Sequence, residues 1–278
     1  MAFSNLAKRT VFGAIYGGVI IFSLLWNPTS FGALMVAMMA IAMSEFYDIT
    51  IGKDFRFQRF TALLCAVSFF MVMLFHREFG LPYRWLALPF GLSIFITFSF
   101  VFSKKHLAVD NLAFIYAALV YIALPVSMSP MLAYSGEDYN GKLMLSLFII
   151  IWLSDIGAYF LGSALGQKEG AKKMAPDISP KKSWWGFAGC IVSGVLCAFV
   201  LYRTGMLEFP LIHCLAVGLV VSVTCVVGDL AESLWKRHYN IKDSGNLIPG
   251  HGGMLDRIDS SLVSIPAAAL YLIIFGLI

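Results

Sequence analysis

Apolar and polar residues alternate along this chain in long blocks, and the blocks predict helices that cross a membrane. About 20 mainly apolar residues span the roughly 30 Å of hydrocarbon in a bilayer, and the polar connections here are short, the longest being 166–185 and 229–261. We therefore predict an all-α, polytopic integral membrane protein without an inserted soluble domain. The nine predicted spans are residues 11–26, 31–48, 60–76, 84–102, 111–133, 143–165, 186–203, 210–228 and 262–278.

The composition agrees with this prediction. Of the 278 residues, 59% are hydrophobic and 13% are charged, whereas soluble domains carry about 25% charged residues. The first apolar run follows Lys8 and Arg9, as in a secretory signal peptide, but it leads into "NPTS" without a small-x-small cleavage pattern. We therefore expect this run to be the first membrane helix. We expect no nucleic acid among the partners.

Lysine and arginine are distributed unevenly between the connections. Short loops rich in these residues stay in the cytoplasm. With the N-terminus inside, 16 lysines and arginines fall on the inner side, and four fall outside: Arg77, Arg84, Lys142 and Arg203. This bias predicts an N-terminus inside and a C-terminus outside, with both long polar connections on the cytoplasmic face.

An acidic residue interrupts the sixth apolar run, "WLSDIGAYFLG" at residues 152–162. An ionised carboxylate at that depth is costly unless it is paired, hydrated or bound to metal. Asp155 is therefore a candidate functional residue, and a purely structural charge pair with a neighbouring helix is the alternative.

Two further pairs of acids flank the last long connection. Asp229 and Glu232 stand three residues apart and so share a helix face, with Lys236 one turn beyond Glu232. Asp256 and Asp259 repeat the same spacing. If the two pairs converge at the membrane surface, their oxygens suit a hard cation such as Mg²⁺, which prefers a few carboxylates together with substrate phosphate.

Cations and glycines near these acids suit a phosphate. The segment "PGHGG" at residues 249–253 offers backbone N–H groups that an anion can approach closely, because glycine has no side chain. In "ISPKKSWWG", residues 178–186, Lys181 and Lys182 could contact phosphate or could serve only as membrane-surface anchors, with Trp184 and Trp185 as interfacial residues. The four cations around the acidic pairs are Lys236, Arg237, Lys242 and Arg257.

Together these elements indicate phosphoryl or nucleotidyl transfer at the cytoplasmic interface. A lipid head group would reach the site within the membrane, and a soluble nucleotide would arrive from the cytoplasm. We divide the chain into residues 1–142, with about five spans, and a catalytic region, residues 143–278, with about four spans and both long connections.

The stretch from Ser233 to Asp259 resembles the signature of the phosphatidate cytidylyltransferases, also called CDP-diacylglycerol synthases. That signature reads S-x-hydrophobic-K-R, four residues, K-D-x-small, two residues, hydrophobic, P-x-H-G-G, hydrophobic, x-D-R, hydrophobic, D. This chain has "SLWKRHYNIKDSGNLIPGHGGMLDRID" over these 27 residues. The segments "GDLAES", "ISPKKSWWG" and "SDIGAYFLG" extend the resemblance to about residues 150–278. Trp185 departs from the pattern, because the family usually has a glutamate there, so no role for that glutamate is carried over.

The resemblance implies a reaction in which CTP and phosphatidate give CDP-diacylglycerol and pyrophosphate, with Mg²⁺ required and a second cation left open. It also implies a bacterial cytoplasmic membrane protein with its active site on the cytoplasmic face, and a homodimer. The lipid phosphate is already an anion, so repulsion between two polyanions is the main obstacle, and metal with lysine and arginine reduces it.

The site residues expected on this basis fall into three overlapping groups. The metal ligands are Asp229, Asp256 and Asp259, with Glu232 and Asp155 as weaker candidates. The substrate-binding residues are Ser179, Lys181, Lys182, Lys236, Arg237, Lys242, His251, Gly252, Gly253 and Arg257. The catalytic residues are Asp229, Asp256, Asp259, Lys182 and His251, and His251 either shapes the phosphate pocket or acts as an acid on departing pyrophosphate.

Two other functions remain open from the residues alone. A CTP-dependent lipid kinase would pass the γ-phosphate to a lipid alcohol, and that chemistry needs a dedicated base for a neutral hydroxyl. An ion-coupled transporter would place polar groups through the full depth of several helices, whereas here they cluster towards one face.

Overall fold

The computed structural model describes residues 5–102, 109–136, 138–247 and 252–278. This described part is almost wholly α-helical, apart from one two-stranded hairpin. Within it, eight helices are long and apolar enough to cross a membrane, and a shorter apolar helix covers Thr10–Trp26, at the first predicted span. A polytopic, nearly all-α membrane protein is thereby confirmed. The hairpin, which lies in the polar connection 166–185, is the exception to the all-α prediction among the described residues.

The chain separates into two compact units. Unit 1 comprises Met1–Tyr139 and Asp243–Arg257, and unit 2 comprises Asn140–Lys242 and Ile258–Ile278. The last helix begins in unit 1 and continues in unit 2.

Unit 1 is a bundle of apolar helices. Asn27 begins the second helix, since its side chain accepts a hydrogen bond from the backbone N–H of Ser30 (2.8 Å) and Pro28 takes the first helical position. Gly80 ends the third helix with a left-handed φ of 67°. The elements are α1 (Asn5–Trp26), α2 (Pro28–Thr50), α3 (Arg56–Phe79), η1 (Tyr83–Leu86), α4 (Ala87–Val101), α5 (Val109–Ala118), η2 (Leu119–Ala123) and α6 (Leu124–Ala133).

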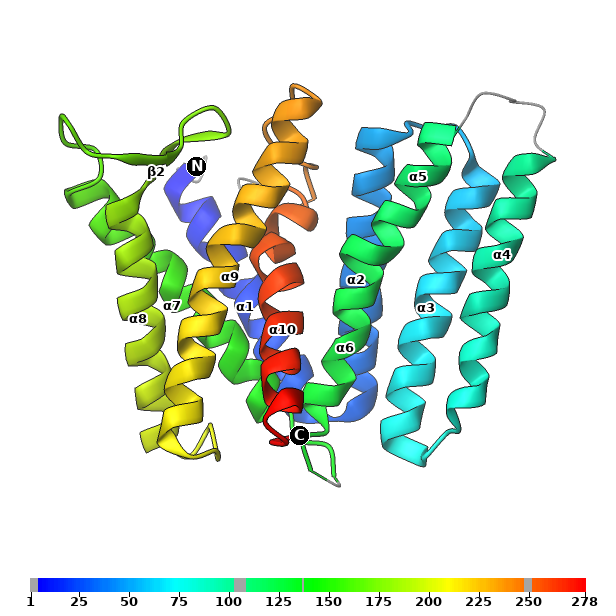
Figure 1. Cartoon of the computed structure of the whole chain (residues 1–278), viewed down its shortest axis with the longest axis horizontal. Helices are drawn as coiled ribbons and strands as arrows, with labels where there is room; N and C mark the ends of the chain where they lie inside the picture. The colour runs from blue at the N-terminus through cyan, green and yellow to red at the C-terminus, as the bar shows by residue number, and fades with distance from the viewer. Residues whose placement is uncertain (1–4, 103–108, 137, 248–251) are drawn as a thin grey trace. The chain divides into compact units, whose positions relative to one another are not determined.

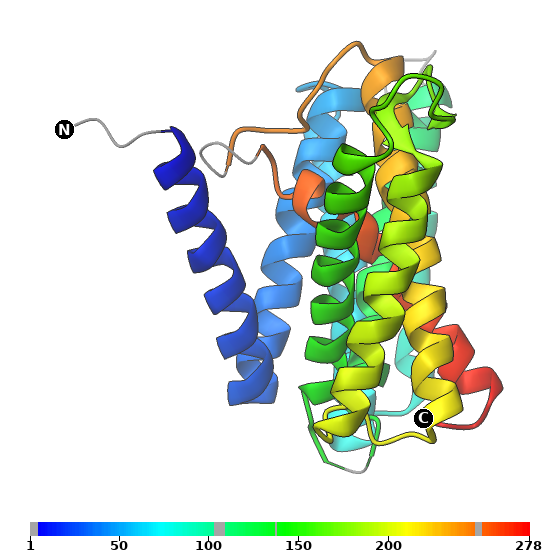
Figure 2. The same ribbon diagram turned by 90° about the vertical axis from the view of Figure 1, so that its left-hand side faces the viewer.

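The segment Val109–Ala133 is a single candidate span with an irregular middle. A π-helical turn, η2, joins α5 to α6 just before Pro125, which has no N–H to donate to a preceding carbonyl. Figure 2 shows α1 and α2 meeting at the connection between them and diverging towards their other ends.

Unit 2 is held together by small residues where its helices cross. Its elements are α7 (Lys142–Ala164), β1 (Lys173–Ala175), β2 (Ser179–Ser183), α8 (Trp184–Arg203), α9 (Leu211–His238) and most of α10 (Leu255–Ile274). A Cβ added at Gly157 of α7 would lie 1.8 Å from Ser193 Oγ of α8, and one at Gly194 of α8 would lie 1.8 Å from Ser222 Oγ of α9. Such contacts let the helix backbones approach closely, as membrane helices require.

The polar connections are shorter than the sequence pattern predicted. Helix α9 continues to His238, about ten residues past the apolar run that ends near residue 228, and α10 begins at Leu255 instead of near residue 262. The acids predicted in the 229–261 connection therefore lie on helices. The polar residues at these positions belong to regular, hydrogen-bonded helices, although hydropathy alone suggested a loop.

Each unit, taken by itself, has helix ends that alternate between two sides. In unit 1 the C-terminal ends of α2 and α4 lie at one side with the N-terminal ends of α3 and α5 (Figure 1). In unit 2 the hairpin and the C-terminal end of α9 share one side, and the connection from α8 to α9 lies at the other (Figure 1). This alternation is what a chain crossing a membrane repeatedly must have.

Candidate active site

Three carboxylates from three helices come together in unit 2. Asp155 on α7, Asp229 on α9 and Asp259 on α10 form what we call the carboxylate cluster. Asp259 lies close enough to both other aspartates to be repelled by them, and it is attracted by Lys236. Like charges this close are unfavourable unless cations offset them. The cluster is therefore a place where a further positive charge would be stabilised.

The spacing between α9 and α10 at this cluster is set by main chain. Gly228, which precedes Asp229, lies against the α10 backbone, so that a Cβ there would be 2.6 Å from the carbonyl oxygen of Asp259 and 2.9 Å from Cα of Ser260. Any larger residue at Gly228 would push the two helices apart. The contact brings Asp229, which follows Gly228 in the chain, close to Asp259.

One lysine of the hairpin belongs to this site. Lys182 Nζ lies 2.6 Å from Asp229 Oδ2, with exposed side-chain fractions of 22% and 38%. Ser233 Oγ donates to the other oxygen, Asp229 Oδ1, at 3.3 Å. Adjacent strand residues point to opposite sides, and accordingly Lys181 is exposed while Lys182 is half-buried. The sequence could not distinguish these two lysines, and the structure does.

The base of the hairpin is fixed tightly to the membrane helices. Ser183 caps α8 by accepting a hydrogen bond from Gly186 N (3.2 Å), and a Cβ at Gly166 would lie 1.8 Å from Ser183 Oγ. Gln167 Nε2 donates to the carbonyl oxygen of Lys181 at 2.8 Å. These contacts fix the backbone on both sides of Lys182.

Glu232 is engaged within its own helix. It is buried, and one of its carboxylate oxygens accepts from Lys236 Nζ, one helical turn further on. The predicted i, i+4 pair is therefore present in the structure. Because Lys236 also acts on Asp259, this lysine links the pair electrostatically to the carboxylate cluster.

Asp155 lies on the exposed surface of α7, within a predicted span. The Cys225 thiol of α9 donates to Asp155 Oδ1 at 3.2 Å. The contacts seen at Asp155 are this thiol hydrogen bond and an electrostatic interaction with Asp259. The structural charge pair with a neighbouring helix, the alternative drawn from the sequence, stays a prediction.

The cluster has the donor chemistry that suits Mg²⁺. Among the described residues there is no group of three or more His, Cys, Asp and Glu side chains arranged to hold a metal ion. Magnesium is commonly bound by one or two carboxylates, waters and substrate phosphate. Asp229 and Asp259 are two carboxylates with hard oxygen donors of this kind, so the residue types present fit the ion.

The other predicted acid, Asp256, lies in unit 1 and is held by main chain. Its Oδ2 accepts from Gly253 N (2.7 Å), Ser244 N (2.8 Å) and Ser244 Oγ (2.9 Å). Gly252 has a φ of +80°, and a Cβ there would be 2.5 Å from Asp256 Oδ2. The carboxylate therefore organises the segment that precedes α10.

Sequence reasoning missed one acidic residue beside Asp256. Glu45 of α2 reaches the same segment, where its carboxylate accepts hydrogen bonds from Met254 N and Leu255 N. No motif marked it in the sequence, because Glu45 stands near the end of an apolar run and about 200 positions from its partners. Its location inside a predicted span was the only available signal.

The remaining predicted cations differ in their surroundings. Arg237 donates from Nε to Ile178 O (3.1 Å) and from Nη1 to Ile241 O (3.3 Å), so it fastens the hairpin turn and the end of α9. Lys242 and Arg257 are exposed, and Ser179 is half-buried at the start of β2. His251 lies outside the described residues.

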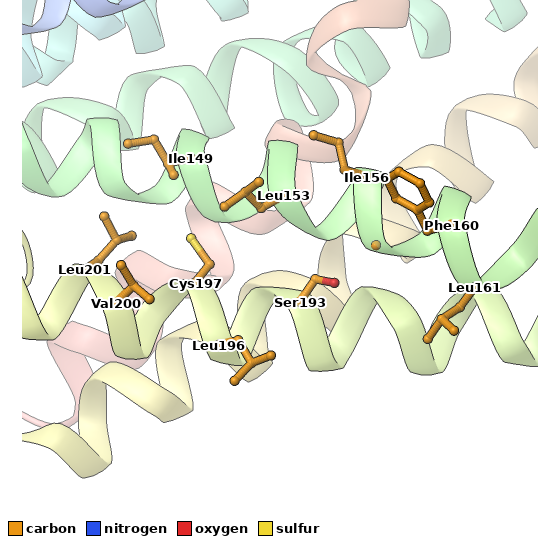
Figure 3. Close-up of a pocket in the computed structure, with 11 residues that line it drawn as sticks. Ile149, Leu153, Ile156, Phe160, Leu161, Ser193, Leu196, Cys197, Val200 and Leu201 are labelled. Atoms are coloured by element: carbon orange, nitrogen blue, oxygen red, sulfur yellow. The ribbon is translucent and has the colours of Figure 1, made fainter.

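Unit 2 also carries an apolar groove along α7 and α8. It has a volume of about 460 Å³ and is lined by aliphatic and aromatic side chains such as Leu153, Phe160 and Leu196 (Figure 3). Ser193 is the one hydroxyl in the lining, and no charged residue is part of it. The groove suits a hydrocarbon chain and offers no cation to a phosphate.

Comparison with known proteins identifies the family. The cytidylyltransferase family model matches residues 7–275. A phosphatidate cytidylyltransferase of Bacillus subtilis is 32% identical over 277 residues, which are 98% of this chain and 99% of the relative. Proteins of that name from Haemophilus influenzae and Brucella suis are 34% identical over 184 residues (63% of this chain, 62% of the relative) and 38% identical over 166 residues (58% and 57%). The resemblance seen in the signature is confirmed, and the chain belongs to the cytidylyltransferase family.

Proposed function

We propose that this protein joins CMP from CTP to phosphatidate, giving CDP-diacylglycerol and pyrophosphate for phospholipid synthesis. The observation that carries this proposal is the family match over nearly the whole chain, together with relatives named phosphatidate cytidylyltransferase. The carboxylate cluster and Lys182 agree with it, because they combine acidic metal ligands with a cation that can contact phosphate.

The reaction is an exchange at the α-phosphorus of CTP. An oxygen of the lipid phosphate forms a bond to that phosphorus, and the bond to the bridging oxygen of the β-phosphate breaks, so that pyrophosphate leaves with the electron pair. The attacking oxygen is already anionic, and no strong base is required. Lys182 and Lys236 offset the negative charge of the two substrates and position them.

Mg²⁺ is part of the proposal, with Asp229 and Asp259 as its ligands and Asp155 and Glu232 as weaker candidates. When bound, the ion supplies charge neutralisation at the phosphates. Lys182 already forms an ion pair with Asp229, and this pair holds that carboxylate in a fixed orientation. When the metal is absent, the same lysine offsets the charge that the metal would neutralise.

We also propose that the site faces the cytoplasm, in a bacterial cytoplasmic membrane, with nine spans, the N-terminus inside and the C-terminus outside. The support is the distribution of lysine and arginine, 16 on one side and four on the other. Cysteine labelling from either side of sealed vesicles, at positions such as Lys181 and Arg84, tests this orientation. A homodimer rests on the family resemblance alone, and mass measurement of the purified protein in detergent tests it.

The decisive experiment uses CTP labelled at either the α- or the γ-phosphorus, with phosphatidate and Mg²⁺. We expect the α label in the lipid product and the γ label in pyrophosphate. The γ label in lipid would instead establish a lipid kinase. Purified protein that transfers neither label would contradict the proposal.

A further inference from the structure

Glu45 connects α2 to the segment that precedes α10, both within unit 1. Its Oε1 accepts from Met254 N at 2.9 Å, and its Oε2 accepts from Leu255 N at 2.8 Å and from Ser244 Oγ at 3.4 Å. The N–H groups at the start of a helix lack partners within the helix, and a carboxylate there also interacts favourably with the helix dipole. Glu45 therefore caps α10 from a distant part of the chain.

Two glycines of the signature make room for this carboxylate. A Cβ at Gly245 would lie 2.6 Å from Glu45 Oε1, and a Cβ at Gly253 would lie 2.5 Å from Glu45 Oε2. Neither glycine has a left-handed φ, in contrast to Gly252. Backbone conformation does not require glycine at Gly245 or Gly253. The space needed by Glu45 explains Gly245, and Glu45 together with Ser244 Oγ, which would lie 2.6 Å from a Cβ, explains Gly253.

One of the amides that sequence reasoning offered to a phosphate, that of Gly253, is already used by the protein. Gly253 N donates to Asp256, and the next two amides donate to Glu45. Two carboxylates thus fix three successive amides at the start of α10. A substrate phosphate would meet negative charge there, which directs it to the lysines and arginines.

Helix α2 provides a firm base for Glu45. Arg59 of α3 pairs with Asp48 of α2 at 2.6 Å, and it also donates to the carbonyl oxygen of Ser44 at 3.3 Å. These contacts lie on both sides of Glu45 in the sequence, so the last turns of α2 are held in place.

We propose that Glu45 is a positioning residue for nucleotidyl transfer. It holds the first turn of α10, the helix that carries Asp256, Arg257 and Asp259, and it acts through that turn without touching substrate. This inference rests on the proposed function and adds to it a role for the N-terminal half of the chain.

The test compares Glu45→Gln with Glu78→Gln in the full-length protein. The first substitution would turn an NH₂ donor towards one of the two backbone donors. Glu78 of α3 instead accepts from Tyr134, and it forms none of the hydrogen bonds seen at the described residues of the segment. We expect Glu45→Gln to lower kcat about 10- to 100-fold, the order expected when positioning is lost, and to raise the Mg²⁺ concentration for half-maximal activity several-fold. Glu78→Gln should change both by less than about twofold.

A readout without turnover separates positioning from general destabilisation. Hydrogen exchange at the amides of Met254 and Leu255 should accelerate in Glu45→Gln, in protein without substrate, while the exchange of α3 amides stays unchanged. Unchanged kcat, Mg²⁺ dependence and exchange would overturn the inference, as would a loss of activity that only follows the loss of folded protein. If the wild type itself transfers no α label to lipid, the proposed function fails instead.

A double-mutant cycle tests the space argument. Gly245→Ala places a methyl group against Glu45 Oε1, and Glu45→Ala removes that oxygen. We expect the double variant to be clearly more active than the product of the two single effects predicts, because the clash is gone. Strictly multiplicative losses would contradict a contact between the two positions.

Discussion

Two groups of carboxylates in this molecule differ in their partners. In the carboxylate cluster of unit 2, Asp229 is paired with a lysine ammonium group and Asp259 is close to other acids and to Lys236. At the start of α10, Glu45 of α2 and Asp256 of α10 accept hydrogen bonds from backbone N–H groups and from a serine. An ammonium group on a side chain can move when a metal or substrate arrives, whereas backbone amides cannot move without rearranging the segment. The carboxylate cluster is therefore suited to binding a metal and substrate, and Glu45 and Asp256 are suited to holding the start of α10 in place.

The largest effect is expected in the carboxylate cluster. Asp229→Asn and Asp259→Asn each remove a negative charge that the proposed cation needs, so we expect Mg²⁺-dependent pyrophosphate release to fall by about 1,000-fold or more, beyond the roughly 100- to 1,000-fold loss of one oriented hydrogen-bond donor. Thermal unfolding in detergent should change little. Asp177→Asn, on an exposed turn residue of the hairpin, is the matched control. Near-normal activity in both cluster variants would remove them from the metal site.

The two adjacent lysines of β2 provide the next comparison. Lys182→Met removes the partner of Asp229, and we expect kcat/KM to fall about 10- to 100-fold, while the exposed Lys181→Met costs about threefold or less. Steady-state kinetics with varied CTP measure both. Equal losses would mean that the hairpin acts only as a diffuse positive charge.

Asp256→Asn distinguishes a structural role of this carboxylate from a role as a metal ligand. The substitution weakens charge-assisted hydrogen bonds to three donors, so we expect a loss of about 1–3 kcal/mol in unfolding free energy. Because Glu45 still accepts from Met254 N and Leu255 N in this variant, the Mg²⁺ concentration for half-maximal activity should stay within about threefold of wild type. A stable variant with strongly altered Mg²⁺ dependence would instead support the sequence-based assignment of Asp256 as a metal ligand.

Arg237→Lys is expected to have the smallest effect. Arg237 donates to the carbonyl oxygens of Ile178 and Ile241, and lysine retains the charge with fewer donors. We expect less than about threefold change in the KM for CTP and a small decrease in melting temperature. A rise of tenfold or more in that KM, at unchanged stability, would identify Arg237 as a direct phosphate contact.

The sequence predicted much of the fold, because long apolar blocks are a strong signal in a membrane protein. It misplaced the ends of α9 and α10, since hydropathy does not register a helix whose exposed turns are polar. The β hairpin was missed because two short strands in a charged segment have no clear periodicity.

The sequence predicted which residue types make up the candidate site better than it predicted how they are arranged. The i, i+4 pairing of Glu232 with Lys236 follows from helix geometry and was expected. The different settings of Asp256 and Asp259 could not be read from their common spacing, because each depends on residues distant in the sequence. Glu45 has no local pattern at all, and only the folded chain reveals its partners.

The contact between Gly228 and the α10 backbone has a consequence for how this protein tolerates change. Because the backbones of α9 and α10 touch there, the distance between Asp229 and Asp259 does not depend on side-chain rotamers or on which lipids surround the helices. Residues that face the hydrocarbon can therefore vary widely without changing the distance between these two aspartates. A single methyl group at Gly228, chemically inert in itself, should be among the least tolerated substitutions in the whole chain.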